Sequence, residues 1–124
     1  MRIVGLHHVQ ISIPVGAEEA ARAFYCGALG LTEIEKPKAL AGRGGLWLAA
    51  GALSVHLGVE DGVDRAATRA HLAYEVTSLP AWHSRLSDAG IELLRSVPLP
   101  GYERFEFRDP FGNRVELIES VGQA

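Results

Sequence analysis

Hydrophobic and polar residues alternate in several short segments of the chain, a pattern typical of strands that bury one face. The alternation is clearest from Ile3 to Ile13 and from Ala70 to Val76. A stretch with helical spacing follows each segment and ends at Gly30 or at Gly90, because glycine readily takes the left-handed conformation that closes a helix. Three more short strands are predicted after each helix: 32–36, 44–49 and 52–59, then 92–95, 102–108 and 114–119. Each half of the chain is therefore predicted to have the element order βαβββ.

The two halves also share short sequences at a constant spacing. Val55-His56-Leu57 recurs as Val115-Glu116-Leu117, and the glycines that end the two helices recur at the same spacing. Such a repeat indicates that one structural unit is used twice. We expect an α+β fold with a single domain over residues 1–124, in which module one covers about 3–59 and module two about 69–119.

Successive side chains of a strand point to opposite faces, so each predicted strand has an apolar face and a polar face. The apolar faces need cover from the helices, which leaves the polar faces open. Four residues of the polar faces combine imidazole and carboxylate groups: His8, His56, His71 and Glu116. These groups suit a divalent first-row metal ion such as nickel, zinc, manganese or iron. The sequence therefore predicts a metal site with these four ligands.

Further polar side chains share one face of the strand predicted at 102–108. Tyr102, Arg104 and Arg108 alternate there with two phenylalanines that face the helix. A guanidinium can hold a substrate carboxylate through two parallel hydrogen bonds, so Arg104 and Arg108 are candidate clamps for an anion. The segment around Trp47 is apolar on both faces, so the alternation does not decide whether Trp47 lines the pocket or packs beneath it. We expect Tyr102, Arg104 and Trp47 to contact the substrate.

The composition of the 124 residues limits the possible classes of protein. With 48% hydrophobic and 22% charged residues, the chain is typical of a soluble globular domain. Twelve basic and fifteen acidic residues give a net charge of −3, which argues against nucleic acid or an anionic membrane as a partner. The single cysteine, Cys26, excludes an intrachain disulfide and a CxxC site. Neither a signal peptide nor an apolar run of about 18 residues is visible, so we expect a cytoplasmic protein.

Four motifs follow one another along the chain. They are His8-Val9, Phe24-Tyr25 followed by Leu29-Gly30-Leu31, His71-Leu72-Ala73-Tyr74-Glu75-Val76, and Asp109-Pro110-Phe111-Gly112-Asn113-Arg114-Val115-Glu116-Leu117. This ordered set resembles the vicinal oxygen chelate superfamily, which includes glyoxalase I, methylmalonyl-CoA epimerase, extradiol dioxygenases, fosfomycin-modifying enzymes and bleomycin resistance proteins. The resemblance extends over nearly the whole chain, and the last motif is its most specific part.

The resemblance implies two βαβββ modules whose mixed, curved sheets form a concave metal-binding cleft, with the helices on the outer face and often within a homodimer. It implies that His8, His71 and Glu116 are metal ligands. His56 lies at a fourth ligand position, where glyoxalase I and the epimerase usually have Glu or Gln. In active relatives a small substrate binds the metal, a Lewis acid, through two neighbouring oxygens while a base moves a proton. Glu116 is the first candidate base. Two glutamates on the same face are alternatives: Glu75 and Glu106.

We expect a metal-dependent, glyoxalase-like isomerase or lyase that acts on a small molecule with two neighbouring oxygens. Two alternatives stay open. His8, His71 and Glu116 alone form the two-histidine, one-carboxylate triad of non-haem iron dioxygenases. A fourth ligand at His56 would occupy a position that oxygen chemistry needs open. The other alternative is a drug-binding or resistance protein without catalysis, although its metal-free members lack the ligand set that this chain retains.

Overall fold

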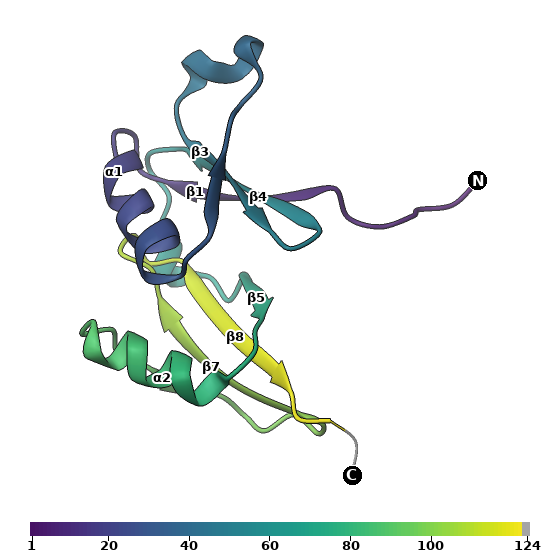
Figure 1. Ribbon diagram of the computed structural model, residues 1–124. Helices are drawn as coiled ribbons and strands as arrows, with labels where there is room; N and C mark the ends of the chain where they lie inside the picture. The colour runs from purple at the N-terminus through teal and green to yellow at the C-terminus, as the bar shows by residue number, and fades with distance from the viewer. Residues whose placement is uncertain (123–124) are drawn as a thin grey trace. The chain divides into compact units, whose positions relative to one another are not determined.

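The computed structural model describes residues 1–122 and divides the chain into two compact units, Met1–Val63 and a second that begins at Asp64 (Figure 1). Each unit contains one four-stranded sheet. The first unit contains β1 (His8–Ile13), α1 (Glu18–Ala21), η1 (Arg22–Ala28), β2 (Thr32–Ile34), η2 (Lys38–Arg43), β3 (Leu46–Ala50) and β4 (Leu53–Val59). The second contains η3 (Arg65–Ala67), β5 (His71–Glu75), α2 (Leu79–Asp88), β6 (Leu94–Arg95), β7 (Tyr102–Arg108) and β8 (Arg114–Ser120). The predicted α+β fold with two βαβββ modules is confirmed.

The first sheet has the strand order β1-β4-β3-β2. β1 runs parallel to β4, and the other two pairs are antiparallel. The register places His56 of β4 directly beside Gln10 of β1 and Trp47 of β3. His8 lies beside Ser54, two positions before His56, so both histidines lie on the same face of the sheet.

The second sheet repeats this arrangement with the order β5-β8-β7-β6. β5 and β8 are its parallel pair. Glu116 of β8 lies between Ala73 of β5 and Glu106 of β7, and His71 lies beside Arg114. The polar face of this sheet therefore has two carboxylates next to each other near its centre.

Each sheet buries the face that strand parity predicts to be apolar. The buried apolar strand residues are Ile13, Leu46, Leu48, Val55 and Leu57 in the first unit and Phe105, Phe107, Val115 and Leu117 in the second. The helical segments add Ala21, Phe24 and Tyr25 in the first unit and Leu79 and Leu86 in the second. Burial of this apolar surface is the main force that holds each helix on its sheet.

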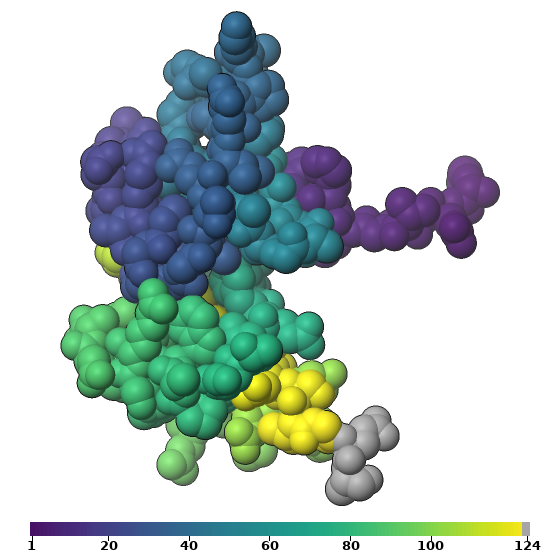
Figure 2. Space-filling model, in the orientation of Figure 1, coloured from purple at the N-terminus to yellow at the C-terminus, as the bar shows by residue number. Residues whose placement is uncertain are grey.

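The first strand is shorter than the alternation predicts, so the expected start at Ile3 is wrong. β1 begins at His8, where it pairs with Ser54 near the start of β4. The residues before His8 have no neighbouring strand over most of their length, and Ile3 is 91% exposed (Figure 2). Alternation indicates where a strand can form, but pairing decides where it does.

The apolar spacing before Gly30 predicts one regular helix, and the structure has two geometries there. α1 is an α-helix of four residues, and η1 continues it as a π-helix of seven. In a π-helix the hydrogen bonds span five residues, as in the bond from Leu29 N to Phe24 O at 3.0 Å. The wider turn accompanies the burial of two adjacent rings, Phe24 and Tyr25. The sequence pattern also missed η2 and η3, which are short 3-10 helices in predicted connections.

Glu119 of β8 fixes the start of α2. Its carboxylate accepts hydrogen bonds from the backbone N–H groups of Ser78 at 2.7 Å and Leu79 at 2.8 Å. These groups have no partner inside the helix, and a negative charge is favourable at the positive end of the helix dipole. Ser78 turns the chain there in the left-handed conformation, with φ of 59°. This contact anchors α2 to the sheet at its first turn.

Gly45, just before β3, allows the chain to approach β4 closely. Its φ is +81°, and a Cβ at this position would overlap the carbonyl oxygen of Leu57 in β4. The backbone N–H of Gly45 also donates to Glu18 Oε2 at 3.2 Å. Leu57 follows His56 in the chain, so this close approach lies next to a predicted ligand.

We predict that Gly45→Ala lowers the free energy of unfolding by roughly 3 kcal/mol or more, because left-handed strain and a backbone overlap are combined. Gly51→Ala is the matched control, since Gly51 also has a positive φ (+58°) but has nothing within 4 Å of the added Cβ. The control should lose only about 1–2 kcal/mol. Urea unfolding of both variants measures the difference, and equal losses would contradict the role given to the overlap.

Candidate functional site

His56 lies at the centre of a stack of three aromatic rings in the first unit. Its imidazole is nearly parallel to the indole of Trp47, with centroids 4.0 Å apart and 2° between the planes. The ring of His8 stacks on His56 at 4.2 Å and 14°. Because β4 lies between β1 and β3, His8 and Trp47 flank the imidazole. His56 is only 6% exposed, and the stack fixes the plane of its ring.

Burial lowers the pKa of His56 below its ordinary value, and the neighbouring His8 and His7 lower it further. Both causes disfavour the charged ring. The neutral imidazole has a lone pair on one nitrogen, and this is the form that binds a metal ion. His7 adds a further contact, because its Nδ1 lies 3.0 Å from Nδ1 of His8. The first unit therefore presents a neutral histidine beside a second one.

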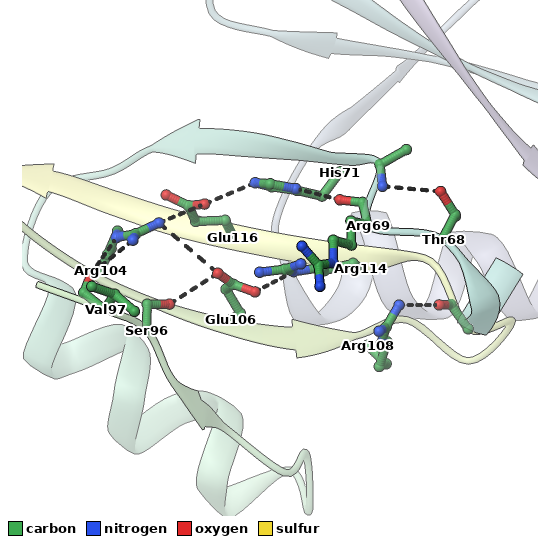
Figure 3. A network of polar contacts seen from close by, with 12 residues as sticks. Thr68, Arg69, His71, Ser96, Val97, Arg104, Glu106, Arg108, Arg114 and Glu116 are labelled. Atoms are coloured by element: carbon green, nitrogen blue, oxygen red, sulfur yellow. Dashed lines mark hydrogen bonds and ion pairs between the residues drawn. The ribbon is translucent and has the colours of Figure 1, made fainter. Parts of the chain in front are cut away.

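His71 and Glu116 face each other across β5 and β8 in the second unit (Figure 3). Nδ1 of His71 lies 2.9 Å from the carbonyl oxygen of Arg69. A carbonyl only accepts hydrogen bonds, so we assign the hydrogen to Nδ1. Nε2 then lies 3.0 Å from Oε1 of Glu116. In the neutral ring Nε2 has only a lone pair, and two lone pairs at this distance need a proton or a metal cation between them.

Arg104 of β7 holds the same oxygen of Glu116. Its Nη1 donates to Glu116 Oε1 at 3.3 Å and lies 3.9 Å from Oε1 of Glu106. Its Nε and Nη2 donate to the carbonyl oxygen of Val97 at 3.1 and 2.7 Å. Each guanidinium nitrogen of Arg104 therefore has a partner within the protein. We expected Arg104 to bind the substrate. In this structure its guanidinium instead holds Glu116 and the carbonyl of Val97.

Glu106 is a buried carboxylate whose charge is compensated. Arg114 Nε donates to its Oε2, and Ser96 Oγ donates to its Oε1 at 3.1 Å. The hydrogen bond from Arg114 holds the pKa of Glu106 below its usual range. A carboxylate stabilised as an anion in this way is a weak proton acceptor. The geometry thus favours Glu116 over Glu106 as a base.

The other predicted residues lie on the polar side of the second sheet. Tyr102 is 42% exposed, and Glu75 is exposed at the end of β5. Arg108 Nη1 donates to a carbonyl of the turn between β7 and β8 at 3.0 Å. Sequence reasoning missed the ion pair of Arg114, although parity places this residue on the polar face. It also missed the carbonyl of Val97, because a main-chain acceptor leaves no signal in the side-chain pattern.

The four predicted ligands occur as two pairs, one in each unit. His8 stacks on His56, and His71 contacts Glu116. Among residues 1–122, no three His, Cys, Asp or Glu side chains are grouped closely enough to hold a metal ion. The donor types of both pairs, imidazole nitrogen and carboxylate oxygen, fit zinc, nickel, manganese or iron. The 3.0 Å contact between Nε2 and Oε1 in the second pair fits a shared proton or a bound cation.

Comparison with known proteins identifies the family of this chain. The family model of the Glyoxalase/Bleomycin resistance protein/Dioxygenase superfamily matches residues 5–117. The chain belongs to this superfamily. A crystal structure of a glyoxalase-family protein from Bacillus anthracis is 42% identical to it, covers 97% of this chain and 98% of its own, and superposes with a TM-score of 0.91.

Less similar solved structures share the fold. Lactoylglutathione lyase from Agrobacterium tumefaciens is 19% identical over 95% of each chain, with a TM-score of 0.73. A mutant of the fosfomycin resistance protein FosX from Listeria monocytogenes, complexed with Mn(II) and 1S,2S-dihydroxypropylphosphonic acid, is 19% identical. That match covers 97% of this chain and 95% of FosX, with a TM-score of 0.79. Among curated proteins, none matches the chain.

No helix within residues 1–122 is both long enough and apolar enough to span a membrane.

The lowered pKa of His56 predicts that stability falls as the pH drops below about 6.5, its ordinary pKa. As the pH falls, His56 is protonated more readily in the unfolded chain than in the folded chain. The stability present at neutral pH is therefore lost progressively as the pH falls from about 6.5 to the lower pKa of the folded state. The lowered pKa of Glu106 acts only below about 4.5. His56→Gln should therefore flatten the dependence between pH 7 and pH 5. Urea unfolding in EDTA measures it. The control is His83→Gln, a change at an exposed histidine of α2 whose ring edge contacts Phe105. An unchanged slope in His56→Gln would contradict this assignment.

Proposed function

We propose that this chain is a metal-dependent enzyme of the glyoxalase type, an isomerase or a lyase for a small molecule with two neighbouring oxygens. The pair of His71 and Glu116 carries the proposal, because an imidazole nitrogen and a carboxylate oxygen, Nε2 and Oε1, face each other at 3.0 Å. The hydrogen bond from Nδ1 to the carbonyl of Arg69 fixes this orientation. Metal-binding histidines usually make such a bond with their second ring nitrogen.

His8 and His56 are proposed as the other two ligands. The lowered pKa of His56 supports this role, since a neutral ring binds a cation without first losing a proton. A bound nickel, zinc, manganese or iron ion would act as a Lewis acid toward two oxygens of the substrate. The Mn(II) complex of FosX, which has the same fold, is consistent with a metal in this family.

Glu116 is proposed as the residue that moves the proton. The described contacts of its carboxylate, from His71 and Arg104, are both at Oε1. Oε2 therefore has no partner among residues 1–122 and can accept a proton from the carbon next to the substrate oxygens. Arg104 holds the carboxylate in place during this transfer. Tyr102 and Trp47 are still proposed as substrate contacts.

The complete site needs both kinds of unit. Each unit supplies one pair of ligands, so four ligands require the first unit and the second unit of one chain or of two. A homodimer is the proposed assembly, and sedimentation velocity measures it. A monomer that binds the metal with full affinity would instead assign the site to a single chain.

Metal binding tests the proposed function. We predict that the EDTA-treated protein binds about one Zn(II), Ni(II), Mn(II) or Fe(II) ion per chain in calorimetric titrations. His71→Ala and Glu116→Gln should each weaken binding by more than about 100-fold, because loss of an outer partner alone costs about 10- to 100-fold. His83→Ala is the control histidine and should bind normally. If none of the four metals binds to the unmodified protein, the proposal is wrong.

Activity assays then separate the reaction classes. The metal-loaded protein is assayed with hemithioacetals, with acyl-CoA epimers, and with catechols in the presence of dioxygen. Turnover of either of the first two supports the proposed lyase or isomerase. Oxygen uptake with a catechol would assign the dioxygenase instead. Tight metal binding with no turnover of any of these compounds would favour the drug-binding alternative.

A further inference from the structure

Three basic side chains lie in a row across the second sheet, from β5 through β8 to β7. The register places His71 directly opposite Arg114, and Arg114 directly opposite Arg108. Residues in such positions share one face of the sheet, and neighbouring strands are about 4.8 Å apart. Arg69 lies just before β5, and its carbonyl contacts His71. We call His71, Arg114 and Arg108 the basic row.

The basic row contains an electrostatic conflict that the protein only partly relieves. Arg108 and Arg114 are like charges in directly opposed positions, an arrangement that destabilises a sheet. Glu106 compensates part of this charge through Nε of Arg114. Among the described residues, Arg108 donates through Nη1 alone, to a carbonyl of the following turn. No hydrogen bond or ion pair of the Arg69 guanidinium is found within residues 1–122, and Arg69 lies just before β5.

Arg114 is anchored in a way that leaves its outer donors available. Its Nε is bound to a buried carboxylate, which is itself held by Ser96. Its two terminal nitrogens have no partner in the described part of the chain, and 27% of the side chain is exposed. A guanidinium held by one edge offers a fixed fork of N–H donors to an oxyanion. Arg104 differs, because all three of its nitrogens are bound within the protein.

We propose that the basic row binds the anionic group of the substrate, a carboxylate or a phosphoryl group, through the terminal nitrogens of Arg114 and the free donors of Arg108. This inference rests on the proposed function, because it assumes that the anion binds next to the proposed metal ligands. Arg114 and Glu116 are two residues apart on one face of β8, so the two sites are about 7 Å apart. The substrate class is then a small acid whose charged group lies a few bonds from its two neighbouring oxygens.

The test uses the metal-free protein of residues 1–124 at low ionic strength, so that no metal can recruit the anion. Inorganic phosphate and acetate are titrated separately, and binding is followed by the ¹⁵N shifts of the arginine Nε groups. We expect saturable binding that Arg108→Gln weakens by about tenfold, since a hydrogen bond to a charged group is lost. Arg114→Lys keeps the charge next to Glu106 but removes the fork, and we expect a loss of similar size.

Arg95→Gln is the matched control, because Arg95 lies in the same sheet opposite Phe105, on the other face. It should bind phosphate normally. Preference for phosphate over acetate identifies a phosphoryl group, and the reverse identifies a carboxylate. Absence of saturable binding, or equal losses in all three variants, would overturn the inference.

Metal titrations of the same proteins keep the two ideas separate. Normal metal binding together with absent anion binding would reject the basic row alone. Normal anion binding to a protein that takes up no metal would reject the metal-dependent function alone. Within residues 1–122 the guanidinium of Arg108 makes a single hydrogen bond, to a carbonyl of a turn, so Arg108→Gln gives a clear answer even if Arg114→Lys folds poorly.

Discussion

Two carboxylates buried side by side determine how the second unit is built. Glu106 and Glu116 are direct neighbours on β7 and β8, and they are only 6% and 4% exposed. Like charges at this spacing repel, and burial removes the water that would screen them. Arg104 lies between them, while Arg114 and His71 each hold one of the two. Removal of Arg104 or Arg114 would weaken the compensation of a buried negative charge.

This compensation also distributes charge along the polar face. Carboxylate oxygens are concentrated near the middle of the sheet, next to Nε2 of His71. Guanidinium groups extend from there toward the start of β8, where Arg108 and Arg114 oppose each other. One face therefore offers acceptors for a cation and donors for an anion at neighbouring positions. The metal ion and the acidic substrate that we propose would need such a combination.

The fold was largely predictable because burial against a helix acts on every second residue of a strand. That constraint is local, so alternation identified the strands and assigned His56 and Glu116 to polar faces. It failed at Ile3, since the length of β1 depends on where β4 begins, which is a fact about a distant segment. The π geometry of η1 was also missed, because apolar spacing in a short stretch does not separate an α-turn from a π-turn.

The candidate site was less accessible to sequence reasoning than the fold. Parity assigns a side chain to a face, but it gives no information on which acceptor each donor reaches. Arg104 looked available for a substrate because its acceptor, the carbonyl of Val97, has no counterpart in the side-chain pattern. Arg114 was overlooked because its partner, Glu106, lies on the neighbouring strand and is brought within reach only by the register of β7 and β8.

The ring stack of the first unit has an optical consequence. Light emission from an indole depends on the groups in contact with it, and Trp47 is in face-to-face contact with His56. The chain has two tryptophans, one in each unit. Trp82 is on α2, where its ring lies 5.3 Å from the guanidinium carbon of Arg85. The intrinsic fluorescence of Trp47 should therefore report changes at His56. Trp82, in a different environment, serves as an internal reference.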